Sequence, residues 1–202
     1  LAEPVTDVEQ VPLLQALGRV LAADVVSPIS VPPHDNSAMD GYAFRGAQLI
    51  DGQALSLRVA GTVLAGAAWP GTVGAGEGVK ITTGAMMPAG LDTVVPQELV
   101  RVEDDGSSAD AVVHLPASVV RPGNNRRLAG EDLMQGQPAL RKGERLSPAA
   151  LGLLASLGLA EVGVCRRLRV AYFSTGNEIL SPGDAPREGA VYDSNRYTVF
   201  GL

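Results

Sequence analysis

The chain has 202 residues, enough for one large or two small domains, and 46% of them are hydrophobic. The net charge of −6 and the lack of a basic run argue against a groove for nucleic acid. The sequence shows neither a signal peptide nor an apolar run of the roughly 18 residues that a membrane span needs.

The residue types also indicate the kind of fold and the compartment. Glycine (24) and proline (14) are abundant and aromatic residues make up only 4%, which favours turns and β-structure over long helices. Cys165 is the single cysteine, so an internal disulfide is excluded, and we expect a buried thiol in a reducing compartment, the cytoplasm.

The first 30 residues predict two short elements. Residues 13–17 form an apolar stretch that is helical for a turn or two before Gly18. Residues 20–26 then have the composition of a strand.

Residues 32–44, with the sequence PPHDNSAMDGYAF, are the most informative segment. The two prolines make the entry stiff and extended, and the Asp-Asn-Ser run at 35–37 favours tight turns. Asp40 then stands directly before Gly41 and the start of a strand. A carboxylate on such a turn can bind a metal ion or contribute to a phosphate site. The alternative is a surface turn with incidental charges.

Residues 36–122 predict a small barrel or sandwich. Short strand-like runs occur at 55–63, 78–83 and 93–102, and turn-forming residues at 65–67 and 104–108 separate them.

A polar segment, 123–146, precedes a predicted helix. Ser147 is a good N-cap and Pro148 suits the first helical position, so the apolar residues 149–157 should be helical up to Gly158.

The last part of the chain has the pattern of an α/β domain. Residues 168–173 form an apolar run without alternation, as in a strand of a parallel sheet that is covered on both faces. The loop that follows, STGNE at 174–178, would present polar groups at the strand's carboxyl end. Asp193 or Ser194 would cap a helix whose first N–H groups can hold an anion. Strand-end loops of this composition are common, so the loop alone is a weak signal.

Five segments in a fixed order carry a resemblance to a known family. They are PHDNSAMDGYA (33–43), KITTGAMMPAGLDTVV (80–95), GED (130–132), RVAYFSTGNE (169–178) and YDSNR (192–196). Together they resemble the molybdopterin molybdenumtransferase family, which includes the carboxy-terminal domain of gephyrin. The resemblance runs from about Val11 to Leu202.

This resemblance implies the last step of molybdenum cofactor synthesis. The enzyme takes adenylylated molybdopterin and molybdate, releases AMP, and places molybdenum on the dithiolene sulfurs. Magnesium is the expected cofactor, because Mg²⁺ typically binds one or two carboxylates together with phosphate oxygens and water.

The resemblance also implies roles for individual residues. Asp40 and Glu178 match functional acidic positions and are the expected catalytic and metal-binding carboxylates. Thr83 matches the family's catalytic threonine and would offer a hydroxyl and a backbone N–H to an oxyanion. The substrate-binding candidates are Thr175, Gly176, Asp193, Ser194, Arg127 and Asp132.

Several of these residues have a structural alternative. Asp40 would cap its own turn, Thr83 would satisfy the end of a strand, and Asp193 would cap its helix. Asp132 would pair with one of the two neighbouring arginines, 126 or 127. His34 and His114 have no partner at metal-ligand spacing and are expected to be surface residues.

The implied architecture is mixed but mainly β. An extended N-terminal domain (1–35 and 124–165) carries an inserted β-barrel-like domain (36–123), and residues 166–202 begin an α/β molybdopterin-binding domain that is incomplete here. We therefore expect the chain to be part of a longer protein. The family pattern is a cytoplasmic homodimer, with each cleft between the barrel-like domain of one subunit and the α/β domain of the other.

Two other hypotheses remain beside the transferase. The chain could be a gephyrin-like scaffold that binds peptides without catalysis, but a scaffold would not need to keep Asp40, Thr83 and Glu178. It could be another α/β pterin- or nucleotide-processing protein that shares only the STGNE region. The DNSAMDGYA segment, which lies outside that region, disfavours this second alternative.

Overall fold

The computed structural model describes residues 5–103 and 111–202. The turn predicted at 104–108 therefore lies outside the described residues. The chain divides into two compact units, Gln10–Val164 on the one hand and Leu1–Glu9 with Cys165–Leu202 on the other.

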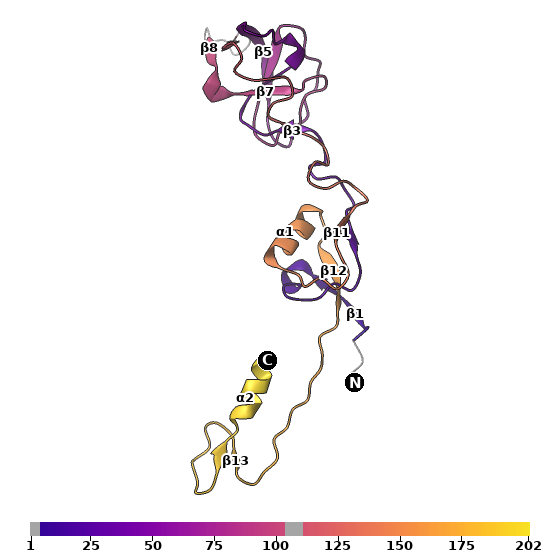
Figure 1. The fold of residues 1–202 in the computed structure, drawn as a ribbon, viewed down its shortest axis with the longest axis vertical. Coiled ribbons are helices and arrows are strands. Elements are labelled where there is room, and N and C mark those ends of the chain that lie inside the picture. Colours follow the sequence, from indigo (N-terminus) through magenta and orange to yellow (C-terminus); the bar gives the residue numbers. More distant parts are fainter. Residues whose placement is uncertain (1–4, 104–110) are drawn as a thin grey trace. The chain divides into compact units, whose positions relative to one another are not determined.

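A curled sheet dominates the first unit (Figure 1). It has six strands in the order β7-β4-β6-β5-β9-β8. Strands β5 and β6 are parallel and all other neighbours are antiparallel. The strands span Gly41–Phe44 (β4), Leu55–Val63 (β5), Glu77–Ile81 (β6), Thr93–Pro96 (β7), Arg101–Glu103 (β8) and Val112–Leu115 (β9).

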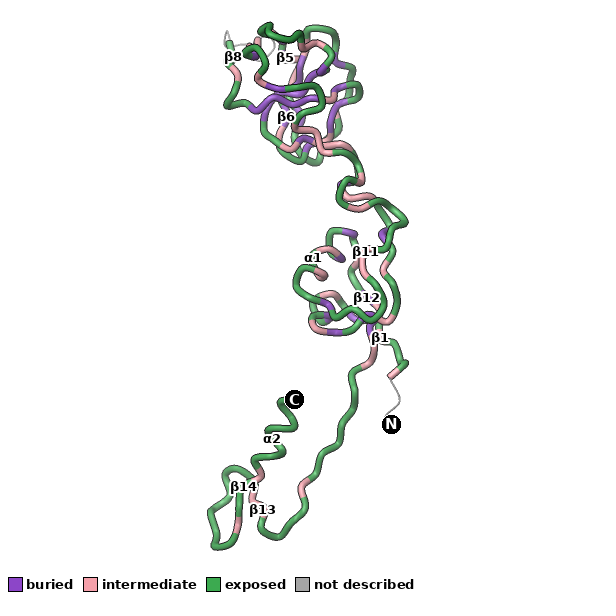
Figure 2. Tube along the Cα trace, in the orientation of Figure 1, coloured by how far each residue is buried: buried purple, intermediate pink, exposed green. Residues whose placement is uncertain are grey.

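Strands β4 and β7, at one end of this sheet, are covered on both faces. Every residue of β4 and of β7 is buried, as the burial colours in Figure 2 show for this region. Tyr42 and Phe44 belong to one apolar cluster, whereas Ala43 between them belongs to another, because successive side chains of a strand point to opposite faces. β4 is thus fixed from both sides, and Asp40 immediately precedes it.

The strand predicted at 93–102 is interrupted. Three residues of 3₁₀-helix, Gln97–Leu99 (η3), lie between β7 and β8. Pro96 ends β7, and a proline has no N–H to continue a ladder of hydrogen bonds. Two further 3₁₀ turns are Leu13–Gln15 (η1) and Gly46–Gln48 (η2).

Short pairs of strands lie outside the large sheet. β1 (Val8–Pro12) pairs with β12 (Glu161–Cys165), β2 (Val25–Val26) with β11 (Pro138–Leu140), and β3 (Asn36–Ser37) with β10 (Arg126–Arg127). The strand predicted at 20–26 is thus reduced to two residues, with isolated bridges at Val20 and Leu21. The Cys165 thiol, expected to be buried, is half-buried at the end of β12.

The predicted helix forms as α1, Pro148–Ser156. The Ser147 hydroxyl accepts a hydrogen bond from the Ala150 N–H at 3.1 Å, and Gly158 follows the helix with φ +77°. α1 packs against η1 over a third apolar cluster, which contains Val11, Ala16, Leu21, Leu146, Leu154, Val162 and Val164. Neither α1 nor α2 of the described chain is long and apolar enough to cross a membrane.

The second unit contains little regular structure. β13 (Ile179–Leu180) pairs in parallel with β14 (Val191–Tyr192), and α2 spans Ser194–Gly201. The strand predicted at 168–173 does not form, and that prediction is wrong for this structure. No neighbouring strand among the described residues pairs with it, and Leu168 and Phe173 are 73% and 80% exposed.

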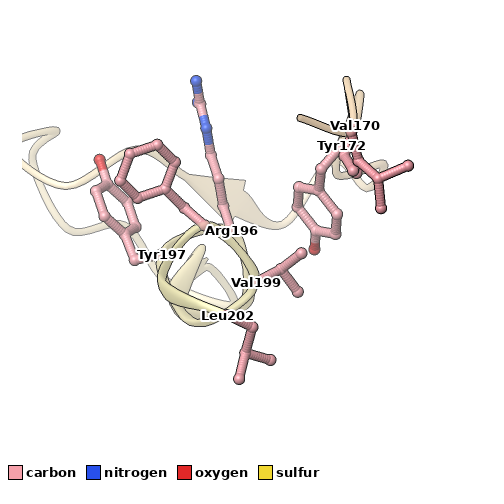
Figure 3. Close-up of a pocket in the computed structure, with 8 residues that line it drawn as sticks. Val170, Tyr172, Arg196, Tyr197, Val199 and Leu202 are labelled. Atoms are coloured by element: carbon pink, nitrogen blue, oxygen red, sulfur yellow. The ribbon is translucent and has the colours of Figure 1, made fainter. Parts of the chain in front are cut away.

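An apolar hollow of about 720 Å³ lies between this extended segment and α2 (Figure 3). Val170 and Tyr172 of the segment line it, together with Val199 of the helix and Leu202 directly after the helix. Such apolar surface is typical of an element that packs against further structure.

The mainly β fold is confirmed. The domain limits at 35/36, 123/124 and 165/166, and closure of the sheet into a barrel, stay predictions.

Candidate functional site

Asp40 and Thr83 meet at one end of the large sheet. Asp40 directly precedes β4, and Thr83 lies just after β6. Because Gly41 is opposite Ile81 in the antiparallel pair, the residues beyond these two come together. One carboxylate oxygen of Asp40, Oδ1, accepts hydrogen bonds from the Thr83 N–H at 2.6 Å and the Thr83 hydroxyl at 2.8 Å.

The backbone around Asp40 is tightly specified. The buried Ser37 side chain makes a local turn, in which its hydroxyl donates to the Met39 carbonyl at 2.6 Å and accepts from the Met39 N–H. A Cβ atom at Gly41 would lie 2.0 Å from the Val95 carbonyl oxygen. Only glycine therefore allows β7 to approach so closely beside Asp40.

The two bonds from Thr83 stabilise the charged form of Asp40. They favour the ionised carboxylate, the backbone N–H more than the hydroxyl, and hold the pKa of Asp40 below its usual value. Asp40 is exposed, and no hydrogen bond from the described residues reaches its Oδ2 atom. The corner can thus present an anionic oxygen to a cation or to a metal-bound water.

We expect Thr83→Val to raise the pKa of Asp40 toward its usual value without restoring it fully, because the N–H donor remains. Because the pKa of Asp40 is lower in the folded than in the unfolded chain, the ionised carboxylate adds to the free energy of unfolding at pH values above the usual pKa of an aspartate. This contribution is lost as the pH falls through the pKa of the folded state. In Thr83→Val the contribution should be smaller. Carboxyl NMR titration and unfolding curves at neutral and acid pH measure both effects. Thr82→Val is the control, because the hydroxyl of Thr82 accepts from the Ala65 N–H, whereas that of Thr83 donates to Asp40. An unchanged pKa of Asp40 in Thr83→Val would contradict the expectation.

The polar segment forms a second cluster. Arg127 donates from Nε to Glu131 at 2.5 Å and from a terminal nitrogen to Asp132 at 2.7 Å. Glu131 also accepts from the Leu128 N–H at 2.8 Å. The bond to Glu131, followed by that to Asp132, raises the pKa of Arg127, and the same arginine lowers the pKa of Glu131. Asp132 therefore pairs with Arg127, one of the two structural alternatives that the sequence leaves open.

Strand β3 brings the motifs of the first unit together. It pairs with β10, and Asn36 also forms a bridge with Met86, which follows Thr83 closely in the chain. The Ala38 N–H donates to the Asn125 carbonyl at 2.9 Å. The segments 33–43, 80–87 and 124–132 thus lie side by side, although about ninety residues separate the first from the last.

Glu178 and its neighbours belong to the second unit. The exposed Glu178 carboxylate folds back over Gly176, where a Cβ would lie 2.4 Å from it, and Thr175 is exposed beside them. Asp193 is the N-cap of α2: it accepts from the Arg196 N–H at 3.1 Å and from the Ser174 hydroxyl at 2.5 Å. Ser194 is the first residue of that helix.

The described residues hold no group of three or more His, Cys, Asp or Glu side chains that could bind a metal ion. Asp40 and Glu178 are single exposed carboxylates in separate units. Each fits the role of one protein ligand to Mg²⁺, which takes its other ligands from phosphates and water.

Sequence reasoning did not assign a role to Asp35 or to Ser174, both of which lie inside recognised motifs. The carboxylate of Asp35 contacts Arg126 and the Ala129 N–H, and Ser174 contacts Asp193. The DNS run indicated local turns, but its contacts with residues 126–129 depend on the tertiary fold.

A family model described as the MoeA N-terminal region, domains I and II, matches residues 1–158. The chain therefore belongs to the MoeA family.

Similar proteins and structures agree with this. The molybdopterin molybdenumtransferase of Haemophilus influenzae is 43% identical over 198 residues, and molybdopterin molybdenumtransferase 2 of Mycobacterium tuberculosis is 42% identical over 188. These alignments cover 96% and 92% of this chain but 46% and 45% of the relatives, so the chain spans about half their length. The crystal structure of a molybdopterin biosynthesis moeA protein from Pyrococcus horikoshii matches 98% of the chain and 52% of its own, with a TM-score of 0.85 and 33% identity.

Proposed function

We propose that the chain is part of a molybdopterin molybdenumtransferase, which inserts molybdate into adenylylated molybdopterin and releases AMP. The observation that carries the proposal is the corner in which both donors of Thr83 bind Oδ1 of Asp40, while no hydrogen bond from the described residues reaches Oδ2. The names of the relatives support the same activity.

The chemistry suits this corner. Cleavage of a phosphoanhydride depends on positioning and charge neutralisation more than on covalent catalysis. Asp40 and Glu178 would hold Mg²⁺, which when bound neutralises phosphate charge. The two hydrogen bonds from Thr83 favour the ionised form and lower the pKa of Asp40, and Thr83 would orient the carboxylate toward the ligand. In this proposal Thr175, Gly176 and Ser194 contact the substrate.

Arg127 needs a more specific role. Two carboxylates already neutralise it, so it is a poor free cation for molybdate. We propose that the Arg127–Asp132 pair shapes the substrate site. The N–H groups of residues 128–132 already donate within the protein and do not serve as donors to the substrate. Asp193, as the cap of α2, would keep the helix N-terminus directed at the ligand.

We further propose a cytoplasmic homodimer in which Asp40 of one subunit works with Glu178 of the other. Apolar surface in the first unit supports an assembly: Leu14 is 94% exposed, and only Leu154 of the apolar helix α1 is buried. The exposed apolar hollow beside α2 supports continuation of the α/β domain beyond Leu202.

The test is AMP release from adenylylated molybdopterin by a protein that continues to the length of the relatives. We expect release that molybdate stimulates and that needs Mg²⁺, and little or none from residues 1–202 alone. Absence of stimulated release by the longer protein would contradict the proposal and favour the scaffold alternative.

A further inference from the structure

Asp35 lies where three segments of the candidate site meet. Its Oδ1 atom accepts a hydrogen bond from the Ala129 N–H at 2.8 Å, and its Oδ2 atom forms an ion pair with Arg126 Nε at 3.1 Å. Its backbone carbonyl accepts from the Met87 N–H at 2.9 Å. One residue thus contacts both the segment that follows Thr83 and the segment that contains Arg127.

The side-chain bonds of Asp35 hold the turn that carries the second cluster. Ala129 lies between Leu128 and Glu131, which close this turn by two hydrogen bonds, and Arg126 precedes Arg127 on β10. The side chains of Asp35 and Arg126 are 37% and 28% exposed, so part of this ion pair is shielded from water. The Asp35 carboxylate therefore links its own segment to this turn by two specific interactions.

We propose that Asp35 is a positioning residue, which sets the Arg127–Asp132 pair relative to the Asp40–Thr83 corner. This inference rests on the proposed function, because only there do these two clusters act on one substrate. Asp35 itself touches no reacting atom.

Loss of these two interactions should shift the turn without unfolding it. The Gly130 N–H still donates to the Pro32 carbonyl at 2.9 Å, and the Asp132 N–H donates to the Val31 carbonyl at 3.0 Å. The turn would remain attached at its far end and become free at the end next to β10.

Three variants separate the effect of the hydrogen bond to Ala129 from that of the ion pair with Arg126. Asp35→Asn keeps an acceptor for the Ala129 N–H but places an amide donor beside Arg126. Asp35→Ala removes both the hydrogen bond and the ion pair. Arg126→Gln removes only the ion pair. Asp24→Ala is the matched control, because Asp24 accepts the Lys142 N–H at 2.7 Å in the turn beside β2 and β11.

The first measurement is made on the 202-residue chain. Hydrogen exchange of the Ala129 amide should rise about tenfold or more in Asp35→Ala and little in Asp35→Asn. The Nε–Hε NMR signal of Arg127 should shift or broaden in Asp35→Ala and Arg126→Gln. Asp24→Ala should change exchange at Lys142 and leave the signal of Arg127 unchanged. These readouts do not depend on transferase activity, so they can fail or succeed independently of the proposed function.

The second measurement is a double-mutant cycle on AMP release by the longer protein. Asp35→Asn should lower the rate of AMP release about tenfold or more and leave thermal unfolding unchanged. In a protein that already carries Asp132→Asn, the same substitution should lower the rate much less. Fully additive losses, or an Arg127 signal that stays unchanged when Asp35 is replaced, would overturn the proposal. If Asp35→Ala does not fold, Arg126→Gln decides by the same criteria.

Discussion

Replacing either acidic residue of the proposed site should lower molybdate-stimulated AMP release by about 10²-fold or more. Asp40→Asn keeps the shape of the side chain, and its remaining oxygen can still accept from Thr83, but the charge is lost. Glu178→Gln likewise removes a charge with little change in volume. Because both side chains are exposed, thermal unfolding should be nearly unchanged.

Exposed acidic residues outside the motifs provide matched controls. Asp51→Asn and Glu188→Gln make the same chemical changes at exposed positions and should keep nearly full activity. The assay needs the longer protein, and circular dichroism melts accompany each variant. A large loss of thermal stability with retained activity would mark Asp40 or Glu178 as structural.

Local patterns predicted the elements that depend on local interactions. Ser147 caps α1 as its type and position indicated, and the strand at 55–63 forms over the predicted residues because its apolar side chains alternate. Asp193 and Ser194 were equal candidates for the cap of α2, and the hydrogen bond from Arg196 identifies Asp193. A local pattern could not decide between two adjacent capping residues.

Predictions that needed a distant partner were less complete. Residues 168–173 have the composition of a strand, but a strand exists only where a neighbour supplies hydrogen bonds, and the described chain provides none. The contact of Asp35 with Ala129 joins residues 94 positions apart. Residue order could indicate that both segments matter, but not that one carboxylate ties them together.

Mixing two inactive variants should restore activity if the proposed cleft uses Asp40 of one subunit and Glu178 of the other. A heterodimer of Asp40→Asn and Glu178→Gln subunits has two clefts, of which one carries both lesions and the other carries none. With random exchange about half of the dimers are mixed and each keeps one intact cleft, so about a quarter of the unmutated activity should return.

The result distinguishes a cleft that two subunits share from a cleft that lies within one subunit. If Asp40 and Glu178 of a single subunit formed the cleft, every cleft of the mixed dimer would carry one lesion, and mixing would restore nothing. Different affinity tags on the two variants show that subunits have exchanged, and mixing Asp40→Asn with Thr83→Val is the matched control. That pair should show no intact cleft, because each lesion disables the same corner on its own subunit. Verified heterodimers of Asp40→Asn and Glu178→Gln without recovered activity would therefore place the site within one subunit.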